Sequence, residues 1–207
     1  MAHIVLIDNF DSFTYNLVDQ FRSLGYPVTI YRNSISPQVI EQSLSELSNP
    51  VVVLSPGPGA PSDAGCMPQL IQNLKGKIPI IGICLGHQAI VEAYGGTVEI
   101  AGEIVHGKAS MMNHNNHPIF NALPNPVSIA RYHSLVATQV PDTLACIADV
   151  EGLTMAVMNQ TDRVCGFQFH PESILTTQGA QLLVNTLNWA MATNHNDVTH
   201  QTEGTVI

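Results

Sequence analysis

The sequence predicts an α/β fold in which an open, mostly parallel β-sheet carries helices on both faces and is joined to a small additional β-rich region. One observation is that short apolar runs alternate with segments of helical periodicity through the first half of the chain. A second is that these runs are nearly continuous, as is typical of strands buried on both faces of a sheet. A third is the change after about residue 97, where short β-rich segments follow one another between turn residues.

In the first half, the predicted strands span residues 3–8, 27–33, 51–55 and 79–84. The helix after the first strand should bury one apolar face, formed by Leu17, Val18, Phe21 and Leu24. Gly25 follows this helix, at a position where a helix C-terminus favours positive φ. Ser36 and Pro37 begin the next helix as cap and first-turn residue. Its predicted inward face consists of Val39, Ile40, Leu44 and Leu47.

In the second half, short strands are expected within residues 97–105, 126–132, 143–149, 153–158 and 163–170. A final helix is expected at about 178–192, with an apolar face formed by Leu182, Leu183, Leu187 and Met191. The sequence contains no internal repeat or linker. Residues 1–193 are therefore predicted to form one domain, and residues 194–207 a polar, frayed tail.

Composition excludes several classes of protein. Hydrophobic residues make up 45% of the chain and charged residues 11%, which is typical of a globular protein. The net charge of -9 argues against a nucleic-acid-binding surface. No apolar run approaches the roughly 20 residues that span a bilayer, and the N-terminus lacks the features of a signal peptide. We therefore expect a cytoplasmic protein. The four cysteines form no CxxC pair, so a structural zinc site is not expected.

The densest chemical signal is the pentapeptide Gly82-Ile83-Cys84-Leu85-Gly86, at a strand-to-helix junction. It has the G-x-nucleophile-x-G form of a nucleophile elbow, a sharp turn that presents one side chain at the end of a sheet. The helix that begins there places partial positive charge near the sulfur and favours the thiolate, the form that attacks. The first N–H groups of this helix lack intrahelical partners, so Leu85 N–H is available to an oxyanion. The alternative is that Cys84 is a small buried core residue, as free cysteines usually are.

A candidate base and its orienting group follow the last predicted strand. A cysteine nucleophile requires an imidazole, and the imidazole requires a group that orients it. In extended chain, residues two apart share a face, so His170 and Glu172 should point the same way while Phe167 and Phe169 pack. Pro171 biases His170 away from helical geometry. The alternative is a surface pair.

A second loop, Ser55-Pro56-Gly57-Pro58-Gly59-Ala60-Pro61, follows the strand 51–55. Its prolines and glycines predict a rigid loop whose N–H groups can face a ligand, at the edge where open α/β sheets place their sites. It lacks the spacing of a phosphate-binding loop. A tight structural connection is the alternative.

With these segments, the chain resembles the class I (triad-type) glutamine amidotransferases over about residues 3–192. The motifs that carry the resemblance are DNFDSFTYN (8–16), SPGPGAP (55–61), GICLGHQAI (82–90), HGKAS (106–110), RYHSL (131–135) and GFQFHPES (166–173). The resemblance is closest to the glutaminase subunit (component II) of anthranilate synthase. It implies a flavodoxin-like sheet, a lyase complex of tryptophan biosynthesis, glutamine as substrate, a synthase (component I) partner, and no cofactor or metal.

The resemblance also implies residue roles. Cys84 attacks the side-chain carbonyl of glutamine, His170 moves the proton and Glu172 orients His170. The N–H groups of Leu85 and Gly59 form the oxyanion hole. The implied glutamine-binding residues are Gly57, Pro58, Gly59, Gln88, Ser134 and Leu135. Lys108, in HGKAS, is the candidate contact with the synthase, and a solvated turn is its alternative. His133 is expected to pack beside Ser134 rather than to act as a second base.

Two other functions remain open from the sequence. One is the glutaminase subunit of aminodeoxychorismate synthase in the folate pathway. The other is a free-standing γ-glutamyl hydrolase on the same fold, which would need no partner. A vestigial, regulatory triad is disfavoured because all three triad residues are present.

Overall fold

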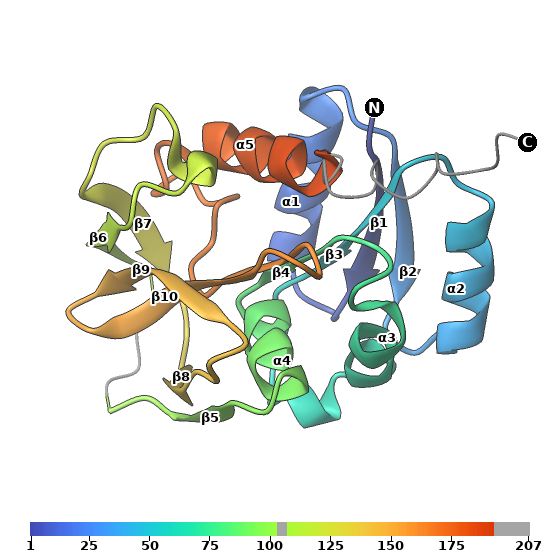
Figure 1. The fold of residues 1–207 in the computed structure, drawn as a ribbon, viewed down its shortest axis with the longest axis horizontal. Coiled ribbons are helices and arrows are strands. Elements are labelled where there is room, and N and C mark those ends of the chain that lie inside the picture. Colours follow the sequence, from blue (N-terminus) through green and yellow to red (C-terminus); the bar gives the residue numbers. More distant parts are fainter. Residues whose placement is uncertain (103–106, 193–207) are drawn as a thin grey trace, which may run out of the picture.

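The structure is a computed structural model that describes residues 1–102 and 107–192, and its centre is a nine-stranded mixed sheet (Figure 1). The strand order is β2-β1-β3-β4-β11-β10-β9-β6-β7. The parallel part consists of β2 (Val28–Arg32), β1 (His3–Asp8), β3 (Pro50–Leu54), β4 (Ile80–Ile83) and β11 (Val164–Phe167). The predicted α/β fold with an open parallel sheet is confirmed.

The β-rich region extends this sheet with antiparallel strands. They are β10 (Leu153–Asn159), β9 (Ala145–Val150), β6 (Lys108–His114) and β7 (Val127–Arg131). A separate antiparallel pair consists of β5 (Thr97–Ile100) and β8 (Leu135–Gln139). The sequence did not predict β6 or β8. Only two of the seven side chains of β6 are buried, so this strand has no apolar run to indicate it.

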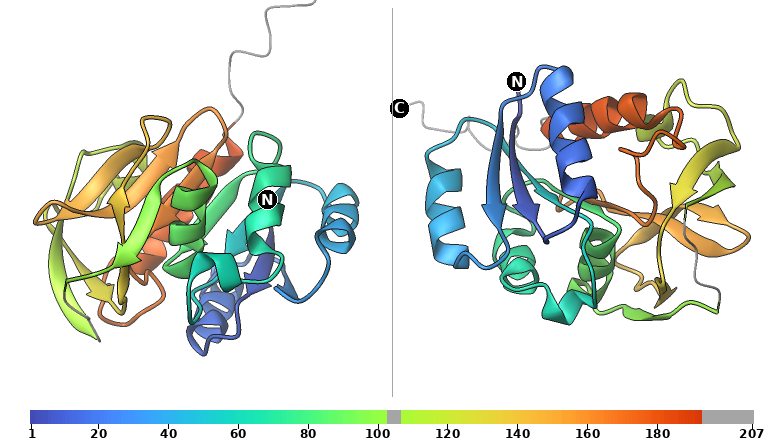
Figure 2. Two further views of the ribbon diagram at one scale, coloured as in Figure 1. Left: turned by 90° about the horizontal axis from the view of Figure 1, so that it is seen from below. Right: turned by 180° about the vertical axis from the view of Figure 1, so that it is seen from behind.

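Helices cover both faces of the parallel sheet (Figures 1 and 2). They are α1 (Phe13–Ser23), α2 (Pro37–Ser45), α3 (Met67–Leu74), α4 (Leu85–Ala93) and α5 (Gly179–Met191). On one face, α1 and α5 pack against alternate strand residues such as Leu6 and Val53. On the other, α2, α3 and α4 pack against the intervening residues, such as Val5 and Val52. This alternation follows from the two-residue period of a strand.

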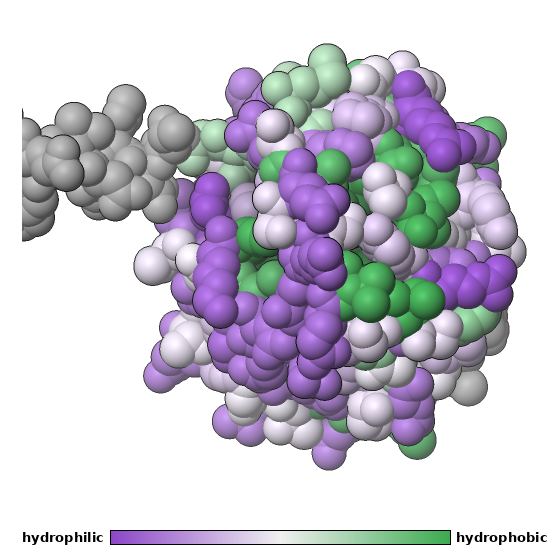
Figure 3. Space-filling model, turned by 90° about the vertical axis from the view of Figure 1, so that its right-hand side faces the viewer, coloured by the Kyte–Doolittle hydropathy of each residue, from purple (hydrophilic) through white to green (hydrophobic). Residues whose placement is uncertain are grey.

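The prediction that Val39 faces the core is wrong. Val39 is 52% exposed, whereas Ile40 and Leu44 on the same helix are buried. The short helix α2 covers an edge of the sheet, so only a narrow stripe of it is buried. Figure 3 views the molecule from the side on which α2 lies and shows hydrophobic atoms among hydrophilic ones there.

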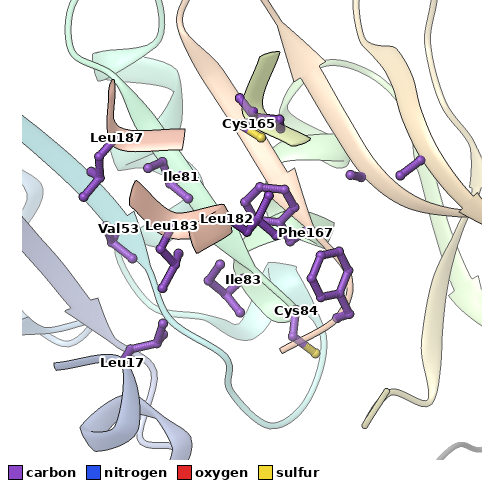
Figure 4. Packing of buried hydrophobic residues seen from close by; sticks show 14 of the residues in the cluster. Leu17, Val53, Ile81, Ile83, Cys84, Cys165, Phe167, Leu182, Leu183 and Leu187 are labelled. Carbon is purple, nitrogen blue, oxygen red and sulfur yellow. The ribbon is translucent and has the colours of Figure 1, made fainter. Parts of the chain in front are cut away.

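The core between the sheet and helices α1 and α5 ends beside the candidate nucleophile. Figure 4 shows Cys84 at the margin of this core cluster, beyond Ile81 and Ile83 of β4. Within the described ranges, none of the helices combines the length and apolar character needed to cross a bilayer. The tail predicted at 194–207 lies outside the described residues.

Candidate active site

The candidate site lies where the carboxyl ends of the parallel strands meet, as expected for an open α/β sheet. Cys84 directly follows β4, and the proline–glycine loop, residues 55–61, directly follows β3. His170 comes three residues after the end of β11. Strands β3, β4 and β11 are consecutive in the sheet, so the fold brings these three segments to one edge.

Cys84 occupies a sharp strand-to-helix turn with φ 50° and ψ -98°. A non-glycine residue holds such a backbone only when its surroundings impose it, and such residues cluster at active sites. A Cβ atom on Gly82 would lie 2.5 Å from the carbonyl oxygen of Gly86, and one on Gly86 would lie 2.5 Å from that of Leu54. Both glycines are therefore required by space, and the turn has the geometry of the predicted elbow.

His170 and Glu172 form a buried pair, with 2.6 Å between His170 Nδ1 and Glu172 Oε1. Their side chains are 3% and 0% exposed. The sequence predicted that an extended chain would bring His170 and Glu172 to one face, and this is wrong: β11 ends at Phe167 and Glu172 lies in a turn. The backbone of His170 is fixed instead by β7, since its N–H donates to Ala130 O at 3.0 Å. The alternative of a surface pair is excluded.

The pair favours the protonated imidazole. Burial by itself lowers the pKa of His170, but hydrogen bonding to Cys84 and Glu172 and the negative charges of both outweigh burial and raise that pKa to about 10. Nε2 is buried and, within the described part of the chain, makes no hydrogen bond of good geometry. Because Nδ1 is held by Glu172, Nε2 is the ring nitrogen available to exchange a proton with Cys84.

Two aromatic rings hold the imidazole from different elements. The centroid of the His170 ring lies 4.9 Å from that of Phe13, on α1, and 5.2 Å from that of Tyr132, which follows β7. Phe13 and Tyr132 also contact each other, with centroids 5.0 Å apart. Neither ring was predicted from the sequence, because only the fold brings these segments together.

A cavity of about 200 Å³ opens at Cys84. Besides Cys84, its lining includes all six residues that were expected to bind glutamine, together with two aromatic side chains that were not. The lining residues are Gly57, Pro58, Gly59, Cys84, Gln88, Tyr132, His133, Ser134 and Leu135. In contrast, Lys108 is exposed at the start of β6 and is not part of this lining.

Two backbone donors lie in the segments around Cys84 and the proline–glycine loop. Leu85 is the first residue of α4, so its N–H has no intrahelical partner. Gly59 has φ +78° and open space around the position of a Cβ atom, whereas a Cβ on Gly57 would lie 2.5 Å from Asn9 Cβ. Within residues 1–102 and 107–192, neither Leu85 N–H nor Gly59 N–H donates a hydrogen bond. Both therefore remain candidates for an oxyanion hole.

The proline–glycine loop is anchored from β1. Asn9 N–H donates to Ser55 Oγ at 2.9 Å, and Asn9 Nδ2 donates to Ser55 O at 2.9 Å. Asn33 Nδ2 in turn donates to Asn9 Oδ1 at 3.0 Å. Because Asn9 and Ser55 are both buried, this network fixes where the loop leaves β3.

Two other histidines near the site are neutral at neutral pH. Burial lowers the pKa of His87 and of His133 to about 4 in each case. His133 Nε2 accepts a hydrogen bond from Arg131 Nε at 3.1 Å, which also disfavours its protonation. Neither supplies a proton as His170 can. Within the described ranges, no three His, Cys, Asp or Glu side chains are grouped so as to hold a metal ion.

The site predicts a selective reaction among the thiols. A glutamine-like electrophile should label Cys84 at least about tenfold faster than the other cysteines, because Cys84 combines a helix N-terminus with an interacting histidine, whereas Cys66 caps α3 but has a thiol pKa that burial raises. Cys66 and Cys165 are buried, and burial raises the pKa of both thiols. Cys146 is exposed and serves as the internal control for general thiol reactivity. Peptide mapping after brief labelling measures the four rates, and preferential labelling of Cys146 would contradict the assignment.

The chain is similar to known proteins of one family. A family model described as glutamine amidotransferase class-I matches residues 5–189. The chain is 68% identical to anthranilate synthase component 2 of Vibrio parahaemolyticus, over 94% of this chain and 100% of the relative. It is 55% identical to the protein of the same name from Buchnera aphidicola, over 92% and 97% of the two chains. A glutamine amidotransferase of Thermotoga maritima has the same fold, with a TM-score of 0.73, 17% identity, and coverage of 92% of this chain and 99% of its own.

Proposed function

This chain belongs to the class I glutamine amidotransferase family, and we propose that it is the glutaminase subunit of anthranilate synthase, acting in tryptophan biosynthesis. In this role it hydrolyses glutamine and passes ammonia to a chorismate-using synthase subunit, component I. The observation that carries the proposal is that Cys84 lies in a cavity lined by all six residues expected to bind glutamine, and that it interacts with the buried His170–Glu172 pair. The 68% identity to anthranilate synthase component 2 supports the anthranilate branch.

The proposed reaction uses this chain's own groups throughout. Cys84 transfers its proton to His170 Nε2, and the thiolate attacks the side-chain carbonyl carbon of glutamine. The N–H groups of Leu85 and Gly59 donate to the resulting oxyanion, an interaction worth about 3–4 kcal/mol per donor. His170 gives its proton to the leaving ammonia. Water then attacks the γ-glutamyl thioester, with His170 as base, and releases glutamate and the thiol.

The two remaining candidate functions differ in what they require. The aminodeoxychorismate branch predicts activation by a different synthase, whereas a free-standing γ-glutamyl hydrolase predicts full activity without one. The relatives at 68% and 55% identity carry the anthranilate synthase name, which favours the first proposal over both. A cytoplasmic location and a contact between Lys108 and the synthase are parts of the same proposal.

The isolated chain is expected to be a poor glutaminase that becomes at least about tenfold more active with its synthase. Gly57 is packed against Asn9 and Leu85, but Gly59 has φ +78° and free space around it. The peptide at Gly59 can therefore turn its N–H out of the site, which removes one donor. A partner that binds the competent arrangement more tightly shifts this equilibrium by its differential affinity.

The experiment measures kcat/KM for glutamine with the chain by itself, with saturating anthranilate synthase component I, and with saturating aminodeoxychorismate synthase. A rise with the first partner only supports the proposal. A rise only with the second assigns the chain to the folate branch. Equal values in all three assays favour the free-standing hydrolase and contradict the partner-dependent site.

A further inference from the structure

A chain of buried amide groups leads from the wall of the cavity to the candidate nucleophile. Gln88 Nε2, on α4, donates to the carbonyl oxygen of Leu135 at 3.0 Å and to Gln168 Oε1 at 3.2 Å. Gln168 Nε2 lies 3.7 Å from Cys84 Sγ and donates to it. Gln168 is 0% exposed and Gln88 is 3% exposed, so water does not compete for these bonds.

The direction of this chain is fixed at its far end. A backbone carbonyl can only accept a hydrogen bond, so Gln88 must turn its NH₂ group toward Leu135. The second hydrogen of the same NH₂ group points to Gln168, which must therefore present its oxygen. Gln168 then has only its NH₂ group to turn toward Cys84. The carbonyl oxygen of Leu135 therefore determines, through Gln88 and Gln168, that a donor and not an acceptor faces the sulfur.

We propose that Gln168 is a further catalytic residue, whose side-chain N–H stabilises the Cys84 thiolate both before attack and when the sulfur leaves the thioester. A hydrogen-bond donor aimed at an ionisable group favours its negatively charged form. Because the amide is neutral, it provides this stabilisation without taking part in proton transfer, which remains with His170. The proposal rests on Cys84 being the nucleophile of the proposed function.

Other groups also act on the sulfur, so the contribution of Gln168 must be separated from theirs. His170, in the segment after β11, interacts with Cys84, and this interaction is one cause of the raised pKa of His170; Glu172 acts through its bond to His170. His133 lines the same cavity from the connection between β7 and β8, with Arg131 bonded behind it. A substitution at Gln168 leaves all of these groups in place; it removes the donor to the sulfur and, unless the new side chain keeps an oxygen, also the acceptor for Gln88.

The test is the pH dependence of the rate at which iodoacetamide alkylates Cys84 in the full-length chain, measured in a Cys146→Ser background. Gln168→Met keeps the length of the side chain and removes the donor, and its midpoint should rise by about half to one pH unit. Gln168→Glu still accepts from Gln88 but places an acceptor at the sulfur, and its midpoint should rise further. The thioester-forming reaction should slow in the same order.

A control separates this effect from loss of stability. Phe21 is fully buried on α1 in the same core cluster, remote in sequence from the elbow. Phe21→Leu should lower the melting temperature while its alkylation midpoint stays at the wild-type value. If Gln168→Met lowers the melting temperature but leaves the midpoint unchanged, the role of Gln168 is only structural and the proposal is overturned. Should Gln168→Met not fold, an unchanged midpoint in Gln168→Glu overturns it equally.

The same measurement distinguishes failure of the proposal from failure of the proposed function. The alkylation midpoint requires neither glutamine nor a synthase. An unchanged midpoint with normal glutaminase activity rejects Gln168 alone. A wild-type chain that releases no ammonia with any synthase rejects the function, while the shift of the midpoint still reports on the Gln168–Cys84 contact.

Discussion

Replacing Cys84 with serine is expected to lower glutamine-dependent product formation by the complex at least about 10⁴-fold, while ammonia-dependent formation stays near the wild-type rate. A serine hydroxyl is a far weaker acid than a thiol, so it gives its proton to His170 much less readily and attacks more slowly at a site built for a thiolate. The strained turn should tolerate the change, because a hydroxyl is no larger than a thiol and Gly82 and Gly86 still accommodate the backbone. The loss therefore reflects chemistry rather than misfolding.

The experiment compares both activities in the complex reconstituted with the synthase subunit. Cys146→Ser is the matched control, because it makes the same chemical change at an exposed site and should retain both activities. Loss of the ammonia-dependent reaction in Cys84→Ser, with assembly intact, would refute the division of labour between the two subunits.

The sequence was informative where chemistry is encoded in short segments. The elbow around Cys84 and the pair His170–Glu172 each occupy a few consecutive residues, and their glycine, proline and strand signals are local. The parallel sheet was equally predictable, because its strands are fully buried and read as continuous apolar runs. In each case the residues that form the feature are neighbours in the sequence, so the pattern can be recognised without the fold.

What the sequence could not predict depends on contacts between distant segments. Gln168 is recognisable as a donor only once Gln88 and Leu135 are seen to fix its direction. The rings of Phe13 and Tyr132 meet at His170 although Phe13 begins α1 and Tyr132 follows β7, two segments far apart in the sequence. Strand β6 was not predicted for a local reason: most of its side chains are exposed, so its sequence has no apolar pattern.

A second large loss of glutaminase activity is expected when Glu172 is replaced. Glu172→Gln should lower kcat for glutamine hydrolysis by about 10³–10⁴-fold with little change in KM, since the carboxylate contacts His170 and is absent from the cavity lining. At 2.6 Å the carboxylate holds a proton on Nδ1 and leaves Nε2 free to accept the thiol proton. A glutamine amide can donate to Nδ1 instead, which places the proton on Nε2 and blocks that transfer.

The pH profile of the same variant gives a second, independent result. Glu172 is one of the groups that raise the pKa of His170 to about 10. Removing its charge should lower that pKa, so the imidazolium is lost at lower pH and the alkaline limb of kcat/KM moves toward neutral pH. If Glu172 were itself the proton acceptor, the variant would instead lose the acid limb of the kcat/KM profile, because no carboxylate would remain to titrate there.

Glu99→Gln provides the control for this prediction. Glu99 is exposed on β5, so the same loss of one negative charge there changes the net charge of the chain but not the site. Its kcat and pH profile should match those of the wild-type complex. Retention of kcat within about tenfold in Glu172→Gln would show that His170 keeps its tautomer without the carboxylate, because this substitution removes both the orienting bond and the charge behind it. The buried pair would then be structural, and the base would be oriented by Phe13 and Tyr132 alone.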